Sequence, residues 1–215
     1  MKLVAFLFFM FCSYTTATAQ KSIKDVISCM PEGMMPYTNS DQMAELLKFT
    51  DTQDSVKVKN IFNGITSIDS ISVDFAKISL SKVSELQLKL LQTSDSSQII
   101  CEIKTIKKPI KESVIKFYST DWQPLDSVYG LPQNLNSDSL LKMFVQKPDT
   151  MSNEKFEELR NYIEPVIMTA HFDKKYDIIT FNLSLPFVQK DNYKELNAII
   201  KKISFKWDGQ NFKKC

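Results

Sequence analysis

The sequence predicts an α+β fold, with helices packed on antiparallel sheets. Three observations support it. Apolar residues recur at helical spacing in 22–30 and 40–47, they alternate with a period of two after position 56, and turn dipeptides such as Asn63-Gly64 separate the alternating stretches. A period near 3.6 is typical of amphipathic helices, and a period of two is typical of half-buried strands. The order of these patterns predicts helices first and an antiparallel meander after them.

The first 19 residues resemble a cleavable export signal. Lys2 supplies a positive start, the apolar run 3–11 is short for a membrane span, and Ala17-Thr18-Ala19 is a small-residue cleavage site. Phe11 precedes Cys12 where a lipoprotein signal needs a small residue, so we expect Cys12 to be lost rather than lipidated. No later stretch is long enough to predict a transmembrane segment. We therefore expect residues 1–19 to be removed and the exported chain to begin at Gln20.

The first helix is predicted over 22–30, because Ser22 and Asp25 form a capping-box pattern ahead of its apolar residues. Pro31 ends this helix, and a second helix follows Ser40.

Strands follow, beginning with the alternation of Val56 and Val58. Asn63-Gly64 predicts a hairpin turn. The stretch from Ile71 to Leu80 is predicted as one strand, with a β-bulge where its alternation slips by one residue. Further strands are expected around 86–90, 98–103 and 113–118.

After a long connection at 120–136, the helical pattern returns and strands follow it again. We expect helices at 138–145 and 153–164, strands at 166–172 and 178–185, and a short helix at 191–200. A closing hairpin is predicted to turn on the two residues Asp208-Gly209.

The two halves share the order helix, helix, sheet, which suggests an N-terminal unit at 20–131 and a C-terminal unit at 132–215. A short echo supports a duplicated unit, because the residues 31–34 (PEGM) resemble 148–151 (PDTM). We expect the two units to pack as one body.

The charge and cysteine content argue against a nucleic-acid-binding protein and against a disulfide-stabilised scaffold. Removal of the signal would leave 26 basic and 25 acidic residues, interspersed along the chain, which does not predict nucleic-acid binding. Three cysteines would remain, Cys29, Cys101 and Cys215, and an odd number does not form a complete disulfide framework. Cys101 lies on an apolar strand face and is interpreted as a buried thiol. A Cys29–Cys101 disulfide is the alternative in an oxidising compartment.

The run CMPEGMMPY at 29–37 has three interpretations. Met34 and Met35 could form an adaptable partner-docking surface, because methionine side chains repack easily. Together with Cys29 they could bind Cu(I), although no histidine or repeated methionine spacing supports a metal site. The favoured interpretation is a packed corner, because Pro31 and Pro36 fix the chain direction there.

No catalytic, cofactor-binding or metal-ligating residue is predicted. The only histidine, His171, alternates with apolar neighbours and is expected to be exposed, with no nucleophile motif nearby. The four glycines form no phosphate-binding loop. Glu157 and Glu158 are adjacent and diverge on a helix, but a carboxylate pair assembled by the fold remains open.

The stretches SIKDVISCMPEGMMPY, MAELLKF, SELQLKLLQT, SQIICEIKTI and FYSTDW together resemble an uncharacterised family of exported Bacteroidales proteins, domain of unknown function 3256. The resemblance covers most of residues 22–125. It implies a Gram-negative gut-type bacterium and a periplasmic, outer-surface or secreted location, and it supplies no catalytic residues.

Exported proteins of this bacterial group are O-glycosylated at Asp-(Ser/Thr)-apolar triplets, which implies candidate sites here. Five such triplets occur, where composition alone predicts about one. Their acceptors are Ser55, Ser70, Ser127, Ser139 and Thr150. The alternative is that Asp and Ser simply begin turns and helices.

These observations favour a non-catalytic binding or accessory protein of the bacterial envelope, with another envelope or host protein as its partner. One alternative is a carboxylate-based hydrolase of envelope or host glycans. A second alternative is a carrier of a small apolar ligand.

Overall fold

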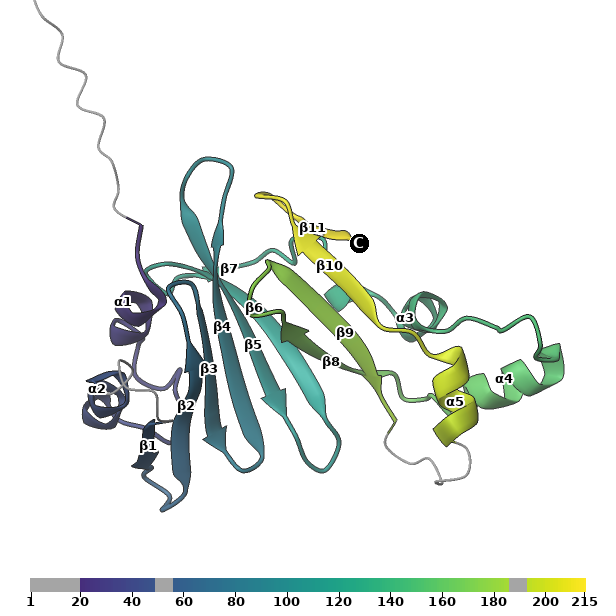
Figure 1. The fold of residues 1–215 in the computed structure, drawn as a ribbon, viewed down its shortest axis with the longest axis horizontal. Coiled ribbons are helices and arrows are strands. Elements are labelled where there is room, and N and C mark those ends of the chain that lie inside the picture. The colour runs from purple at the N-terminus through teal and green to yellow at the C-terminus, as the bar shows by residue number, and fades with distance from the viewer. Residues whose placement is uncertain (1–19, 49–55, 186–192) are drawn as a thin grey trace, which may run out of the picture.

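The computed structural model describes residues 20–48, 56–185 and 193–215, and in these it places two antiparallel sheets with helices on both outer sides (Figure 1). Seven strands form the first sheet as a sequential meander, in the order β1-β2-β3-β4-β5-β6-β7. Four strands form the second sheet, in the order β11-β10-β9-β8. The predicted α+β class with antiparallel sheets is confirmed.

The N-terminal half begins with two helices and continues as the first sheet. Its elements are α1 (Ile23–Ser28), α2 (Ser40–Lys48), β1 (Val56–Lys59), β2 (Ile65–Ile71), β3 (Phe75–Ser81), β4 (Ser84–Gln92), β5 (Gln98–Ile106), β6 (Glu112–Ser119) and β7 (Pro124–Leu125).

The C-terminal half repeats the order of helices before strands, and a helix separates its two hairpins. A 3₁₀ turn at Pro132–Asn134 precedes α3 (Ser137–Phe144), α4 (Asn153–Asn161), β8 (Ile167–Phe172), β9 (Ile178–Ser184), α5 (Tyr193–Ile199), β10 (Ile203–Trp207) and β11 (Phe212–Lys214). The sheets differ in strand number, and the duplicated unit remains a hypothesis, as does the boundary at 131/132.

The predicted capping box starts α1. The Ser22 hydroxyl accepts a hydrogen bond from the Asp25 amide, and the Asp25 carboxylate accepts one from the Ser22 amide. At the other end of α1, the indole of Trp122 donates a 2.9 Å hydrogen bond to the Val26 carbonyl. Local capping therefore begins this short helix, and a distant aromatic side chain holds its last turn.

Two local predictions were wrong. The expected single strand from 71 to 80 is two strands, because residues 72–74 make a turn between β2 and β3. There the Val73 carbonyl accepts a 2.7 Å bond from the Ile23 amide, while the Val73 side chain is 77% exposed. The last hairpin turns on four residues rather than two, because Trp207 pairs with Phe212. The Asp208 carboxylate binds the amides of Gln210 and Asn211, which favours the wider turn.

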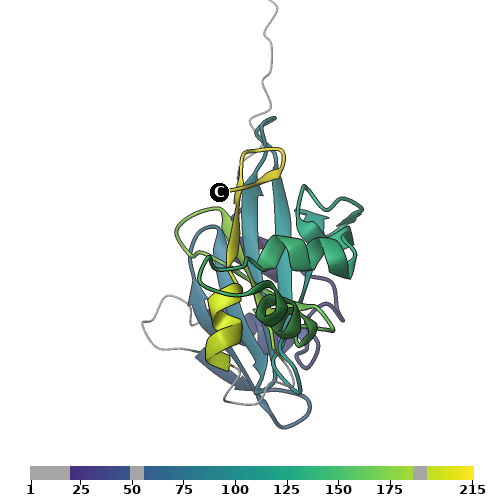
Figure 2. The same ribbon diagram turned by 90° about the vertical axis from the view of Figure 1, so that its right-hand side faces the viewer.

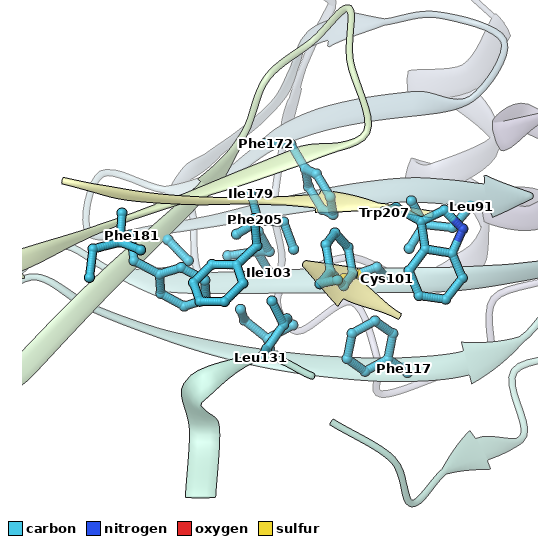
Figure 3. Close-up of a cluster of buried hydrophobic side chains, with 14 of the residues drawn as sticks. Leu91, Cys101, Ile103, Phe117, Leu131, Phe172, Ile179, Phe181, Phe205 and Trp207 are labelled. Carbon is cyan, nitrogen blue, oxygen red and sulfur yellow. The ribbon is translucent and has the colours of Figure 1, made fainter. Parts of the chain in front are cut away.

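Three apolar clusters hold the layers together. The first fills the space between the two sheets, where aromatic side chains from β6, β8, β9 and β10 meet Cys101 and Ile103 of β5 (Figure 3). The second lies between α1–α2 and the opposite face of the first sheet. The third lies among α3, α4 and α5. Figure 2, turned by 90°, shows the C-terminal helices gathered on the outer side of the second sheet.

A row of polar side chains on β4 joins the two sheets. Gln87 accepts a 3.0 Å hydrogen bond from the Phe172 amide of β8. Lys89, only 1% exposed, reaches Asp74 at 2.7 Å and Asp177 of the β8–β9 turn at 3.2 Å. These contacts occupy part of the edge of the second sheet, which would otherwise leave its backbone groups unpaired.

The cysteines are all free in the described structure, so the alternative Cys29–Cys101 disulfide was wrong. Cys101 points into the cluster between the sheets, whereas Cys29 follows α1 on the opposite face of the first sheet. Burial raises the pKa of the Cys101 thiol well above its usual value. The predicted buried thiol is confirmed.

We expect Cys101→Ser to lower the free energy of unfolding by about 1–3 kcal/mol, because it places an unpartnered hydroxyl in an apolar core. Chemical denaturation of the two proteins measures this loss. Cys29→Ser is the control and should change little, because Cys29 is exposed. Rapid modification of Cys101 by a thiol reagent in the native protein would contradict its burial.

Candidate binding groove

A groove with a volume of about 460 Å³ lies on the first sheet, beside the corner that joins α1 to α2. We call residues 29–39 the Pro–Met corner. β5 and β6 provide most of the lining, and the corner adds Gly33 and Met34. The complete lining is Gly33, Met34, Glu102, Lys104, Ile106, Glu112, Val114, Lys116 and Tyr118.

Strand alternation places these side chains together. Even-numbered residues of β5 point away from Cys101 and its cluster, toward the face that carries α1 and α2. The antiparallel register sets Glu102 opposite Lys116, Lys104 opposite Val114, and Ile106 opposite Glu112. Charged and uncharged side chains therefore alternate along the β6 side of the groove, whereas β5 contributes two charged residues followed by Ile106.

Glu102 is the unusual residue of this lining. Its side chain is buried, at 6% exposure, and it has no hydrogen-bond or ion-pair partner among the residues that the structure describes. Burial raises the pKa of the Glu102 carboxyl, an effect that Lys104 and Lys116 partly oppose. Burial, and then the Glu102 charge, raise the pKa of the neighbouring Tyr118 to about 12. The carboxylate faces the groove, and its oxygens are not sealed from solvent as the Ser70 hydroxyl is. Partial burial still disfavours the charged form, which is why the pKa is raised.

The surrounding groups are also available for binding. Neither Lys104 nor Lys116 makes an ion pair within the described parts of the chain. Ile106 and Val114 are 50% and 53% exposed, although they sit on a regular sheet. The groove therefore offers a hydrogen-bond acceptor, two ammonium groups and an apolar floor that is in contact with water.

The two central methionines of the Pro–Met corner are buried to different degrees. Met35 is 6% exposed and belongs to the cluster under α1 and α2, as the packed-corner interpretation predicts. Met34 is half-buried, packs against the same cluster and also lines the groove. Gly33 has a φ of +89°, a conformation that other residues adopt with strain, and it lets the chain turn beside the groove.

The candidate O-glycosylation acceptors differ in their exposure to solvent. Ser127 and Thr150 are exposed, Ser139 is half-buried in the first turn of α3, and Ser55 lies outside the described residues. The Ser70 hydroxyl on β2 is buried without a hydrogen-bond partner. A transferase acting on the folded protein would therefore reach Ser127 and Thr150 but not Ser70. Glycosylation itself remains a prediction.

The groove does not supply the carboxylate pair of a glycosidase. Glu102 and Glu112 are four register positions apart along the strands, which corresponds to about 13 Å at ~3.4 Å per residue. Glycosidase pairs are about 5–10 Å apart. Within the described ranges, no cluster of three or more His, Cys, Asp or Glu residues is suited to holding a metal ion.

His171 lies on β8, exposed to solvent, and does not line the groove. Burial of part of the ring lowers its pKa, and the charges of Lys111, Lys202 and Lys77 act in the same direction.

Comparison with known proteins identifies the family. The family model described as Protein of unknown function (DUF3256) matches residues 15–212.

The chain belongs to this family.

The match confirms the resemblance proposed from the sequence, and it extends the resemblance well beyond residue 125 into the second sheet. A solved structure, a domain of an uncharacterized protein from Porphyromonas gingivalis W83, shares the fold of this DUF3256 protein with a TM-score of 0.74 and 19% sequence identity. The alignment covers 91% of this chain and 100% of that chain. No curated protein matches the chain.

Sequence reasoning missed the central residue of the groove in this DUF3256 protein. It followed Ile99, Cys101 and Ile103 on one face of β5 and did not examine the other face. Glu102 interrupts an apolar run in IICEI, and such an interruption within a buried strand is a signal that could have been used. That the helices leave this part of the sheet open depends on the tertiary structure.

Proposed function

We propose that this protein is an exported, non-catalytic binding protein of the bacterial envelope, which holds an extended segment of a partner protein in the groove. The single observation that carries the proposal is Glu102, a largely buried carboxylate that faces the groove and has no hydrogen-bond donor among the residues that the structure describes. A bound segment would supply that donor. The export signal predicted at 1–19 supports the envelope location, and the described residues contain no helix able to cross a membrane.

The shape and lining of the groove favour a peptide over a small apolar molecule. Four charged side chains line it together with the exposed Ile106 and Val114, and all six come from every second residue of β5 and β6. An extended chain presents its side chains with the same period of two. Among the described residues, the outer side of β6 pairs with another strand only through Phe117 and Tyr118. The groove thus lies beside a strand edge of the kind that accepts extended segments.

Replacing Glu102 with glutamine is expected to stabilise the free protein and to weaken binding. The pKa of Glu102 is raised in the folded state, so ionisation opposes folding. This cost is absent while the carboxyl is protonated, appears as the pH rises past the ordinary value of 4.5, and is complete above the folded-state pKa. Glu102→Gln should therefore raise the melting temperature at neutral pH, by an amount that shrinks on acidification.

Peptides that bind the wild-type protein are selected from a displayed library. Fluorescence titration then measures the affinity of each selected peptide for the wild type and the variant. We expect Glu102→Gln to weaken these peptides about tenfold or more, because the carboxylate accepts a charge-assisted hydrogen bond. The control Glu157→Gln removes an exposed carboxylate on α4 and should leave binding unchanged. Selected peptides that bind both proteins equally, or a glycan that binds where no peptide does, would contradict the proposal.

A further inference from the structure

Exposed apolar side chains gather at one end of the first sheet. Three connections lie at that end, residues 60–64, 82–83 and 107–111, and we call them the hairpin end (Figure 1). Ile61 and Phe62 are 57% and 70% exposed at the tip of the β1–β2 hairpin, and Ile65 beside them is 51% exposed. Val83 in the next tip is 41% exposed. Large apolar side chains that are exposed together at one end of a sheet mark an interaction site.

The tip that carries Ile61 and Phe62 is held in shape. The buried Asn60 accepts hydrogen bonds from the amides of Phe62 and Gly64, at 3.1 and 2.9 Å. Its amide nitrogen donates to Thr66 and to the Leu80 carbonyl of β3. The Phe62 ring stacks edge-to-face on Tyr37 of the Pro–Met corner, at 5.7 Å. The two apolar side chains are therefore presented to water by a braced loop.

Charge is divided between the two ends of the sheet. The three connections of the hairpin end contain the lysines 82, 107, 108 and 111 and no acidic residue. The connections at the opposite end, 72–74, 93–97 and 120–123, contain Asp74, Asp95 and Asp121 and no basic residue. One lysine of the hairpin end, Lys107, pairs with Glu85. The near-neutral chain thus carries positive charge beside its exposed apolar tips.

We propose that the hairpin end docks on an anionic lipid surface. Phe62, Ile61 and Val83 enter the interfacial layer, while Lys82, Lys108 and Lys111 contact the headgroups. Apolar groups surrounded by lysines are the combination that binds such surfaces. At the far end, Asp74 pairs with Lys89 and Asp121 pairs with Lys21, so the orientation toward the membrane rests on the lysines of the hairpin end. A row of protruding tips fits a deformable lipid layer, whereas a protein partner would need matching hollows.

Vesicle co-sedimentation tests this proposal with the protein as exported by its own cells, its N-terminus determined by mass spectrometry. We expect binding to phosphatidylcholine vesicles that contain phosphatidylglycerol, weaker binding in high salt, and no binding to phosphatidylcholine alone. The pair Ile61→Ser and Phe62→Ser should reduce binding ~10-fold or more. The pair Lys82→Ser and Lys108→Ser should reduce it by about fivefold per lysine.

Matched controls come from elsewhere on the chain. Val73→Ser changes a more exposed apolar tip at the acidic end, and Lys174→Ser removes an exposed lysine of the second sheet. Both should bind vesicles as the wild type does. Absence of binding to anionic vesicles, or equal losses in the controls, would overturn the proposal. So would self-association in sedimentation velocity that Phe62→Ser abolishes, because this would assign the hairpin end to a second copy.

Discussion

The double variant Asp74→Asn and Asp177→Asn is expected to lose about 3 kcal/mol of folding free energy, because it leaves the buried ammonium of Lys89 without a counter-charge. Lys89 is 1% exposed, and both carboxylates lie within 3.2 Å of its nitrogen. The side chains of Asp74 and Asp177 are 48% and 42% exposed, so water can reach the site in the variant. We therefore place the loss at the lower end of the range for broken buried pairs.

The position of Lys89 makes this loss a test of how the sheets are joined. Asp74 follows β2 of the first sheet, and Asp177 belongs to the β8–β9 turn of the second. Burial alone would raise the pKa of Asp74, but hydrogen bonds from Lys89 and Ser72 outweigh it and lower the pKa below 3.8. The stabilisation by Asp74 is therefore complete above its ordinary pKa and is lost as the pH falls through the lowered one.

Urea denaturation of the double variant measures the loss, and a triple variant that also carries Lys89→Met is the matched control. Replacing the whole ionic group with an apolar side chain of similar length should recover most of the stability. Equal destabilisation of the double and triple variants would indicate that the contacts of the carboxylates, rather than the unpaired ammonium, determine the effect.

The variant Met35→Ala is expected to lose about 2–5 kcal/mol, as for other buried methionines replaced by alanine. Met35 is 6% exposed and is a member of the cluster under α1 and α2, against which Met30, Met34 and Tyr37 of the corner are only partly buried. Met34→Ala is the matched control, since the half-buried Met34 lines the groove and its removal should cost much less. Thermal melts of the two single variants measure how much each methionine contributes to stability.

If both variants melt like the wild type, the corner is not packed. If Met34→Ala lowers the melting temperature as much as Met35→Ala does, both methionines are core residues, and Met34 is not primarily part of the groove lining. Addition of Cu(I) should leave the melting temperatures unchanged, because the Met35 side chain is buried in an apolar cluster while Cys29 is exposed.

Most elements could be predicted from the sequence because their signals are local. The capping box at Ser22, the alternation of β4 to β6 and the helical spacing of α3 each depend on neighbours within a few residues. The errors arose where a residue distant in the sequence determines the backbone conformation. The turn at 72–74 is stabilised by the Ile23 amide, more than forty positions away in the sequence. A pattern that spans only a few neighbouring residues cannot predict that contact.

The candidate groove was less predictable than the fold. The sequence pointed to the Pro–Met corner, and Met34 does line the groove, but Met35 belongs to the core. Met34 and Met35 are adjacent residues of one type, so composition cannot separate them. Both side chains pack against the α1–α2 cluster, but Met35 is a buried member of it, whereas Met34 is partly buried and also lines the groove.

The sequence by itself determined the class of fold, the membership of the family, the buried Cys101 and the absence of local catalytic motifs, because each depends on residue types at short spacings. Only the tertiary structure decided which surfaces stay open. Glu102 faces an open groove because the side chains around it come from β5, β6 and the Pro–Met corner, and none of the lining comes from α1 or α2. The lysines and the exposed apolar tips lie together because every second connection of a meander falls at the same end of the strands.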